Sequence, residues 1–330
     1  MILGLTGRNA SGKGEVARFL QQGGFEYFSC SDELREEMRR RGVVETRESL
    51  IEWGTRLRAD EGADTLARRV AKRFTPGLNQ VVDSIRHPAE VNHLRTFAGF
   101  FLVRVEAPLE VRFERAKKRA RAGDSMDLES FRQAEARELA SGDPAAQQLL
   151  ATFALADFEV VNDGSIEQLH ERVRAVFREA ASRIPRPDWD DYFLKIADVV
   201  ATRSSCAKRR VAAVIVKDRR IISTGYNGTP RGTRNCSEGG CERCLSLAPS
   251  GTNLHDCLCS HAEENAIVQA AFHGVSLRGA TLYVTMSPCL ICSKMIINAG
   301  LAEVVYRTSY PLSEAARRLL DEAGVTVRRV

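Results

Sequence analysis

The cysteines are distributed very unevenly along this chain of 330 residues, and their positions restrict how its second half can fold. Eight of the nine lie between Cys206 and Cys292, and only Cys30 stands apart. The first residues, Met1–Leu5, lack the charged segment and cleavage site of a secretory signal, so we expect a cytoplasmic protein. In such a chain, clustered cysteines favour metal binding over disulfides. The second half is therefore expected to fold around metal.

Composition limits the broad class of protein. Hydrophobic residues make up 44% of the chain and charged residues 28%, which is ordinary for a globular protein. The length suggests two domains. No apolar run approaches the length that spans a bilayer, so we expect no membrane partner. The net charge of +5 admits anionic partners such as nucleotides.

Residues 1–183 alternate short apolar strands with amphipathic helices, which predicts an α/β domain with a parallel sheet flanked by helices. Residues 184–188 contain two prolines and are predicted to be a linker. The predicted strands are Ile2–Thr6, Glu26–Ser29, Gln80–Asp83, Phe101–Val105 and Phe158–Val161. The predicted helices include Gly14–Gln22, Ser31–Arg41, Leu50–Arg73 and Leu109–Arg121.

Residues 189–330 are predicted to form a second domain, which begins with a helix from Trp189 to about Thr202. Two β-rich segments with a short connection then predict a hairpin, Val211–Val216 and Arg220–Tyr226. Residues 227–260 are too long for an unsupported loop, so something must hold them. The remaining elements are a helix from His261, strand Thr281–Thr285, a helix from Cys289, strand Val304–Tyr306, helix Ser313–Ala323 and strand Val325–Val330.

The strongest chemical signal is His261-Ala262-Glu263 followed by Pro288-Cys289-Leu290-Ile291-Cys292. A His-x-Glu and a Pro-Cys-x-x-Cys segment together are typical of zinc-dependent deaminases of nucleobases. Cys289 and Cys292 are three residues apart, so they share one helix face and can bind one ion. Pro288 suits the first turn of a helix, whose positive end favours ionised thiols.

His261 and Glu263 would diverge on a regular helix, so we expect His261 at the helix entrance, with Ser260 as the N-cap. His261, Cys289 and Cys292 then supply three zinc ligands and leave the fourth position to water. Zinc makes that water a nucleophile near neutral pH, and Glu263 would move its proton. Glu264 is a weaker candidate for that role. The alternative, a purely structural zinc, would usually have a fourth ligand and need no carboxylate.

Together with these motifs, the segments 206–216, 225–232, 261–266 and 287–292 make residues 189–330 resemble deoxycytidylate (dCMP) deaminases. The resemblance implies a cytidine-deaminase-like αβα sandwich that hydrolyses dCMP to dUMP and ammonia. It also implies a homo-oligomer. In many members dCTP activates the enzyme and dTTP inhibits it.

The resemblance also implies roles for particular residues. Asn227, Gly228 and the loop after them would contact the sugar and phosphate, and the alternative is that residues 225–232 form only a glycine-rich turn. Tyr310 would close the substrate pocket, with core packing as the alternative. A structural zinc is implied at Cys206, Cys236, Cys257 and Cys259, with Cys241 and Cys244 as rivals. The alternative for these cysteines is a set of unpaired buried thiols.

The segment from Gly7 to Lys13 follows an apolar strand and opens a helix, as a phosphate-binding P-loop does. Backbone N–H groups around Ser11 and Gly12 would cradle phosphates, and Lys13 would reach the outer ones. Gly14 replaces the usual Ser or Thr that binds Mg²⁺, which leaves Mg²⁺ handling open. The alternative is a remnant loop that binds no nucleotide, such as ATP.

The N-terminal domain resembles dephospho-CoA and nucleoside monophosphate kinases. On that resemblance Asp83 is a Walker-B-like acid, and Arg86 follows it closely. Arg112, Arg115 and Arg119 share a helix face that resembles a phosphate-gripping lid, or else a solvated face.

The function expected from these observations is deamination of dCMP, with a regulatory nucleotide at the P-loop. A second hypothesis is deamination of dCTP, because fusions of this kind resemble bacterial anti-phage proteins that deplete dCTP. Deamination of nucleic acid is disfavoured, since no basic groove interleaved with aromatic residues is evident. A non-catalytic sensor would be expected to lack part of the ligand set. The N-terminal domain can also be an active kinase.

Overall fold

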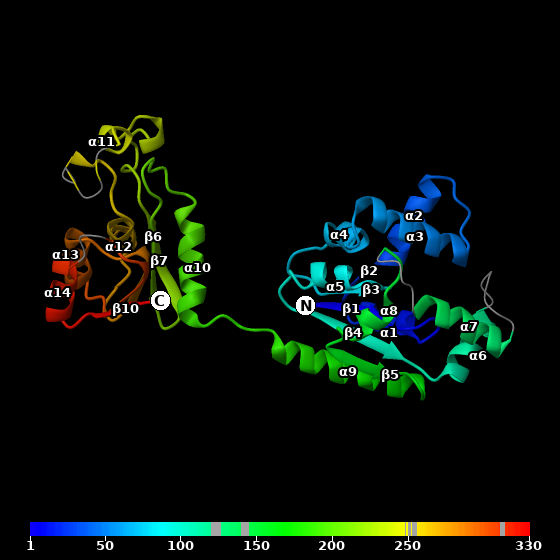
Figure 1. Ribbon diagram of the computed structural model, residues 1–330. Coiled ribbons are helices and arrows are strands. Elements are labelled where there is room, and N and C mark those ends of the chain that lie inside the picture. The colour runs from blue at the N-terminus through cyan, green and yellow to red at the C-terminus, as the bar shows by residue number, and fades with distance from the viewer. Residues whose placement is uncertain (120–126, 140–144, 248, 250–251, 253–255, 311–313) are drawn as a thin grey trace. The chain divides into compact units, whose positions relative to one another are not determined.

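The computed structural model describes residues 1–119, 127–139, 145–247, 249, 252, 256–310 and 314–330 (Figure 1). The chain divides into two compact units, Met1–Pro185 and Arg186–Val330. Each unit has its own five-stranded sheet and its own core. None of the helices in the described part of the chain is both long and apolar enough to cross a membrane.

The N-terminal unit contains a sheet in which every pairing is parallel, in the order β2-β3-β1-β4-β5. This confirms the predicted parallel α/β architecture. Alternate residues of β1 pack on opposite faces. Leu3 belongs to the core beneath the helices Lys13–Gln22 and Ile166–Arg183, and Ile2 belongs to the core on the other face of the sheet. The strands are β1 Ile2–Thr6, β2 Glu26–Ser29, β3 Gln80–Asp83, β4 Phe100–Glu106 and β5 Phe158–Val161.

The long helix predicted over Leu50–Arg73 is wrong, because the chain breaks there into two helices. Gly62 follows the first helix with a φ of 105°, a conformation that glycine adopts without strain. The helices of this unit are α1 Lys13–Gln22, α2 Cys30–Arg40, α3 Arg47–Glu61, α4 Thr65–Ala71, α5 Pro88–Leu94, α6 Leu109–Arg119, α7 Leu128–Leu139, α8 Leu149–Phe153 and α9 Ile166–Arg183.

The C-terminal unit contains a mixed sheet in the order β10-β9-β8-β6-β7. Strands β6, Ala212–Lys217, and β7, Arg220–Tyr226, form the predicted hairpin. Asp218 and Arg219 between them have φ values of 49° and 61°, as the tight turns that match strand twist require. The other strands are β8 Thr281–Met286, antiparallel to β6, and β9 Glu303–Thr308 and β10 Thr326–Arg329, which continue the sheet in parallel.

Helices cover both faces of this sheet, which confirms the predicted αβα sandwich. Ala213 and Ile215 of β6 face the core beneath α12, α13 and α14, whereas Val214 and Val216 face α10. The helices are α10 Trp189–Ala201, α12 Ala262–Phe272, α13 Leu290–Asn298 and α14 Glu314–Glu322. Gly225 lets β7 approach α12 closely, since a Cβ there would lie 2.2 Å from the Ala262 carbonyl oxygen.

The segment between β7 and α12 has structure of its own. It contains a 3₁₀ turn, Cys236–Glu238, and a short helix α11, Glu242–Leu245. Gly228 and Ser260, near its two ends, exchange backbone hydrogen bonds of 3.2 and 2.9 Å. The chain therefore returns to its starting point next to the predicted zinc ligand His261.

Candidate functional site

Three side chains with metal-binding atoms meet at the entrances of α12 and α13. His261 is the N-cap of α12, and Cys289 is the N-cap of α13. The Nδ1 atom of His261 lies 3.4 Å from the Sγ atom of Cys289 and 3.3 Å from that of Cys292. Tetrahedral zinc with ordinary Zn–N and Zn–S bonds separates such atoms by about 3.5 Å. The donor set and its spacing therefore fit zinc.

The predicted N-cap of α12 is wrong by one residue. His261 itself takes the extended backbone conformation of an N-cap, and its backbone N–H donates to Oε2 of Glu264 at 3.1 Å. Ser260 instead pairs with the Gly228 backbone. Glu264 is thus occupied in holding His261, the predicted zinc ligand. Pro288 lies one residue before the N-cap of α13 rather than in its first turn.

Glu263 lies beside this ligand set and is 4% exposed. Burial raises the pKa of its carboxyl to about 7, which suits a group that must accept and return a proton near neutrality. Hydrogen bonds to its thiolate lower the pKa of Cys289 to about 4, and the hydrogen bond from Cys292 has the largest effect. The hydrogen bond to Cys289 raises the pKa of His261 to about 9. Ionised sulfur is the form that binds metal.

The same pocket is lined by His261, Cys289, Glu263, Asn227 and Tyr310. Asn227 is nearly buried, and its amide connects three chain segments. Its Oδ1 accepts from Ser204 Oγ at 2.8 Å and from the Val211 N–H at 2.8 Å, while its Nδ2 donates to the Arg209 carbonyl at 2.8 Å. Asn227 therefore shapes the pocket wall.

Sequence reasoning missed three cationic residues that line this pocket, Lys208, Arg209 and Arg243. The Arg209 guanidinium lies over the Tyr310 ring, 5.5 Å from its centroid. Lys208 and Arg209 could have been found from the sequence, because they lie in the segment 206–216 that carries the family resemblance. A pair of cations beside a neutral amide is the chemistry that binds a phosphate group.

A second group of sulfur atoms lies beside the pocket. It is called here the six-cysteine cluster: Cys206, Cys236, Cys241, Cys244, Cys257 and Cys259. Two overlapping sets of four can hold a metal ion, Cys206, Cys236, Cys244 and Cys259, and Cys241, Cys244, Cys257 and Cys259. Cys236 and Cys257 of the predicted quartet thus fall in different sets. The alternative ligands also belong to these sets, Cys241 to the second and Cys244 to both.

The segment after β1 has the geometry of a phosphate-binding loop. Gly7 and Gly12 have φ values of 146° and 101°. A Cβ on Gly7 would clash with the Val105 carbonyl oxygen, and a Cβ on Gly12 would clash with Asn162 Nδ2. Lys13 Nζ donates to the carbonyl oxygens of Gly7 and Arg8 at 2.8 and 2.9 Å. Among the described residues, the fully buried Ser11 Oγ has no hydrogen-bond partner.

This loop opens into a cavity of about 670 Å³ in the N-terminal unit. Asp83, Arg86, Arg115 and Arg119 line it with the P-loop residues Ser11, Gly12 and Lys13. Burial raises the pKa of Asp83, against the opposing effect of the Lys13 charge. The predicted lid face is wrong for Arg112, which is 1% exposed, donates to the Ala107 carbonyl and pairs with Glu135.

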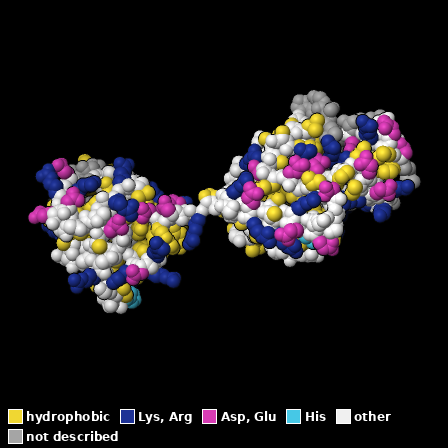
Figure 2. Space-filling model, turned by 90° about the horizontal axis from the view of Figure 1, so that it is seen from below, with side chains coloured by type: hydrophobic (Ala, Val, Ile, Leu, Met, Phe, Trp, Pro, Cys, Tyr) yellow, Lys and Arg dark blue, Asp and Glu magenta, His cyan; other side chains and the backbone are white. Residues whose placement is uncertain are grey.

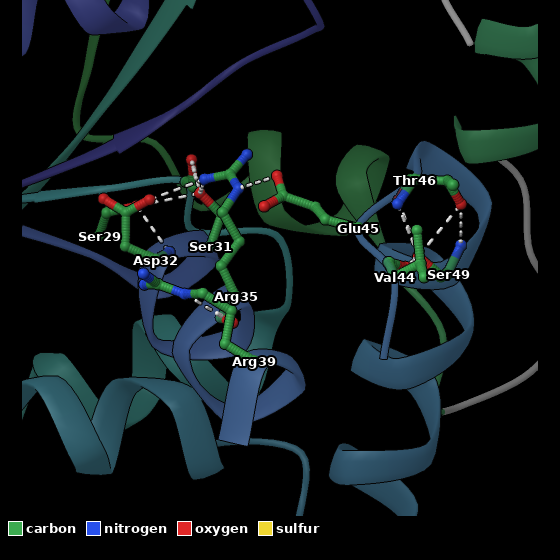
Figure 3. Close-up of polar contacts among 10 residues, drawn as sticks. Ser29, Ser31, Asp32, Arg35, Arg39, Val44, Glu45, Thr46 and Ser49 are labelled. Carbon is green, nitrogen blue, oxygen red and sulfur yellow. Dashed lines mark hydrogen bonds and ion pairs between the residues drawn. The ribbon is translucent and has the colours of Figure 1, made fainter. Parts of the chain in front are cut away.

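The α2 wall of the cavity is fixed by a network around Arg35 (Figure 3). Its Nη1 donates to Ser31 Oγ at 3.1 Å and to Asp32 at 2.7 Å, and its Nε donates to Glu45 at 2.7 Å. Ser31 in turn contacts Ser84, after β3, at 3.3 Å. These contacts hold the segment after α2 against the helix.

Residues 187–308 match the family model described as the cytidine and deoxycytidylate deaminase zinc-binding region, and residues 6–132 match an AAA domain. A deoxycytidylate deaminase of Schizosaccharomyces pombe is 37% identical over 329 residues, 99% of this chain and 96% of that protein. One of Saccharomyces cerevisiae is 51% identical over 144 residues, 44% of this chain and 45% of that protein. The crystal structure of a cyanophage S-TIM5 dCMP deaminase with dCMP and dUMP is 35% identical, with a TM-score of 0.38 over 44% of this chain and 99% of that one.

The similarity to the fission-yeast protein extends over nearly the full length of both chains, so it includes the P-loop unit as well as the zinc-site unit. The zinc-binding family model spans all three ligands that meet at α12 and α13. On this evidence the chain belongs to the deoxycytidylate deaminase family.

Proposed function

We propose that this chain hydrolyses dCMP to dUMP and ammonia in the pocket beside α12. The observation that carries the proposal is the meeting of His261, Cys289 and Cys292 around one point, with the buried Glu263 in the same pocket. A zinc ion held by these ligands supplies the Lewis acidity that makes water nucleophilic near neutral pH. Three protein ligands suit a catalytic zinc, because a fourth position stays open.

The residues of the chain then have distinct roles. Glu263 accepts a proton from the water that attacks C4 of cytosine and delivers it to the adjacent ring nitrogen. It then takes the second water proton from the new hydroxyl group on C4 and passes it to the amino group, which leaves as ammonia while C4 becomes a carbonyl. Lys208 and Arg209 bind the phosphate. Asn227 holds the pocket wall in shape, and Tyr310, beneath Arg209, closes it.

The number of phosphates on the substrate is tested by steady-state assays of dCMP and dCTP with the zinc-loaded chain. We expect a higher kcat/KM for dCMP. The alternative, a dCTP deaminase with a role in phage defence, requires the opposite order. Deamination of a cytosine oligonucleotide, but not of either nucleotide, would contradict both.

Over the face shown in Figure 2, Lys and Arg are interspersed with Asp and Glu, so the charge there is mixed.

We further propose that the P-loop cavity binds a nucleotide such as ATP, and that this nucleotide regulates deamination. The support is the loop conformation around Gly7 and Gly12. Four charged side chains line the cavity together with the loop: Asp83, Arg86, Arg115 and Arg119. Gly14 offers no hydroxyl to Mg²⁺. Titration with ATP, with and without Mg²⁺, tests binding. Transfer of phosphate to a nucleoside monophosphate would instead identify a kinase.

The proposal includes three further properties. At least one structural zinc binds in the six-cysteine cluster, since four thiols whose Sγ atoms lie within 4.8 Å of one another suit structural zinc. The chain is a cytoplasmic homo-oligomer. The support is that none of its nine cysteines, all of them in the described part of the chain, forms a disulfide, and that Val268, Phe272 and Ile291 expose 54, 75 and 59% of their surface. dCTP and dTTP are effectors. Sedimentation with and without each effector tests the assembly.

A further inference from the structure

The two four-thiol sets of the six-cysteine cluster share two members. Cys244 and Cys259 belong to both sets, and each set has two further members of its own. Within each set, all four Sγ atoms lie within 4.8 Å of one another. A thiolate sulfur carries several lone pairs and can bind two metal ions at once. The overlap therefore describes two adjacent coordination sites with a common edge.

Two sulfur–sulfur distances match this arrangement, one in each set. Cys244 Sγ lies 3.9 Å from Cys206 Sγ, in one set, and 3.8 Å from Cys257 Sγ, in the other. Tetrahedral zinc with Zn–S bonds of about 2.3 Å separates two sulfur ligands by about 3.8 Å. A disulfide would bring them to about 2.05 Å. Cys244 is thus at ligand spacing toward both sites.

We propose that the six-cysteine cluster binds two zinc ions that share the thiolates of Cys244 and Cys259. The inference rests on the structural zinc proposed above and adds a second ion and two bridging ligands. Each ion then has four sulfur ligands, the closed coordination of structural zinc. All six cysteines become ligands, and the fully loaded chain carries three zinc ions, one catalytic and two structural.

The surroundings of the cluster suit its charge. Six thiolates and two Zn²⁺ ions carry a net charge of 2−. Lys208, Arg209 and Arg243 line the pocket whose wall includes Cys206 and Cys244, so cations stand beside the cluster. The Ala207 N–H also donates to Cys236 Sγ at 3.4 Å, a contact that stabilises a thiolate.

The cluster also has a structural consequence for the catalytic pocket. Cys259 is separated from the catalytic-zinc ligand His261 only by Ser260, which pairs with Gly228. Two linked ions would tie the 3₁₀ turn at Cys236, the α11 segment and the chain before α12 to one rigid centre. They would hold the long connection from β7 to α12 in place.

The direct test is the zinc content of the purified full-length chain, measured by inductively coupled plasma mass spectrometry, together with ¹¹³Cd NMR of the cadmium-substituted chain. We expect three zinc ions per chain, and scalar coupling between two cadmium resonances through the shared thiolates. Two zinc ions per chain would overturn the binuclear centre and leave a single structural zinc. One would overturn the structural zinc as well. Neither result alters the assay of dCMP deamination.

Variants separate the two sites. Cys236→Ser removes a ligand of the first ion only, and Cys241→Ser removes a ligand of the second only, so each should lower the content from three ions to about two. Cys30→Ala, in the other unit, should retain three. Three ions retained in either cluster variant would contradict the assignment. If a variant does not fold, the cadmium coupling in the unaltered chain still decides, and its absence overturns the proposal.

Discussion

Two adjacent glutamates show how environment assigns different roles to one residue type. Glu263 is buried in the pocket, and burial raises its pKa to about 7, so it can exchange a proton near neutrality. Glu264 accepts the backbone N–H of His261 and fixes the start of α12. The first is therefore the proposed proton carrier, and the second is a positioning residue for the proposed zinc ligand His261.

Glu263→Gln should retain the catalytic zinc and lower kcat for dCMP by about 10²–10⁴-fold, because an amide cannot move the proton. Glu264→Gln is the matched control, since its amide oxygen can still accept the His261 N–H. It should retain most of kcat. Kinetics and metal content of both variants check this, and near-normal turnover by Glu263→Gln would refute the assignment.

Arg209→Ala should raise KM for dCMP by about tenfold with a smaller change in kcat, because one charge-assisted hydrogen bond to phosphate is lost. Deoxycytidine, which has no phosphate, provides the control substrate: its kcat/KM should change little. An equal loss with both substrates would show that Arg209 acts through the fold of the pocket.

The meeting of His261, Cys289 and Cys292 could be predicted because their motif encodes ligand type and spacing together. The grouping of the six remaining cysteines could not, since sequence spacing does not say which thiols meet in space. The predicted quartet paired Cys236 with Cys257, whereas the fold places them in different sets that share Cys244 and Cys259. The capping role of Glu264 was missed because it depends on the residue at which α12 begins.

At the scale of elements, the catalytic groups depend on two helix entrances that the sheet of the C-terminal unit supports. Strand β7 packs on α12, with Ser223 Oγ donating to the Ala266 carbonyl at 2.6 Å. On the other face, Asp190 of α10 accepts from Tyr283 of β8 at 3.0 Å and from Arg328 of β10 at 2.6 Å. Side-chain contacts thus tie the edge strand to the centre of the sheet.

Asp190→Asn should lower the free energy of unfolding by about 1 kcal/mol at pH 7. The hydrogen bond from Arg328 lowers the pKa of Asp190 in the folded state. Its contribution is therefore complete above the unfolded pKa and is lost as the pH falls through the folded value. Urea unfolding at pH 7 and at pH 3 checks this: the difference from the unaltered chain should shrink at low pH. A difference independent of pH would contradict the ionic account.

Strands were predictable at this scale because they are short apolar runs between turn residues, and four of the first five have the predicted bounds. Helix ends were less predictable, since they depend on backbone conformation at single residues. The break at Gly62 divides a helical pattern that continues on both sides. The exposed face of a helix was also hard to predict. Arg112 is spaced so that it shares a helix face with Arg115 and Arg119, but its side chain is buried against α7.

At the scale of the whole molecule, the chain joins a deaminase unit to a P-loop unit, each with its own core. Lys13→Ala should weaken ATP binding by at least tenfold, because the loop then loses the cation that reaches the outer phosphates. Lys72→Ala, at the end of α4, is the control and should bind ATP normally. Isothermal titration of both variants checks the prediction, and unchanged affinity in Lys13→Ala would place the nucleotide elsewhere.

Zinc-dependent hydrolysis of dCMP is the activity to which all the roles proposed for the C-terminal unit belong. The decisive measurement is formation of dUMP and ammonia from dCMP by the purified full-length chain, before chelation, after removal of zinc, and after zinc is restored. We predict turnover that is lost on chelation and recovered with zinc. A chain that is fully loaded with zinc and folded, yet forms no dUMP from dCMP, would contradict the account.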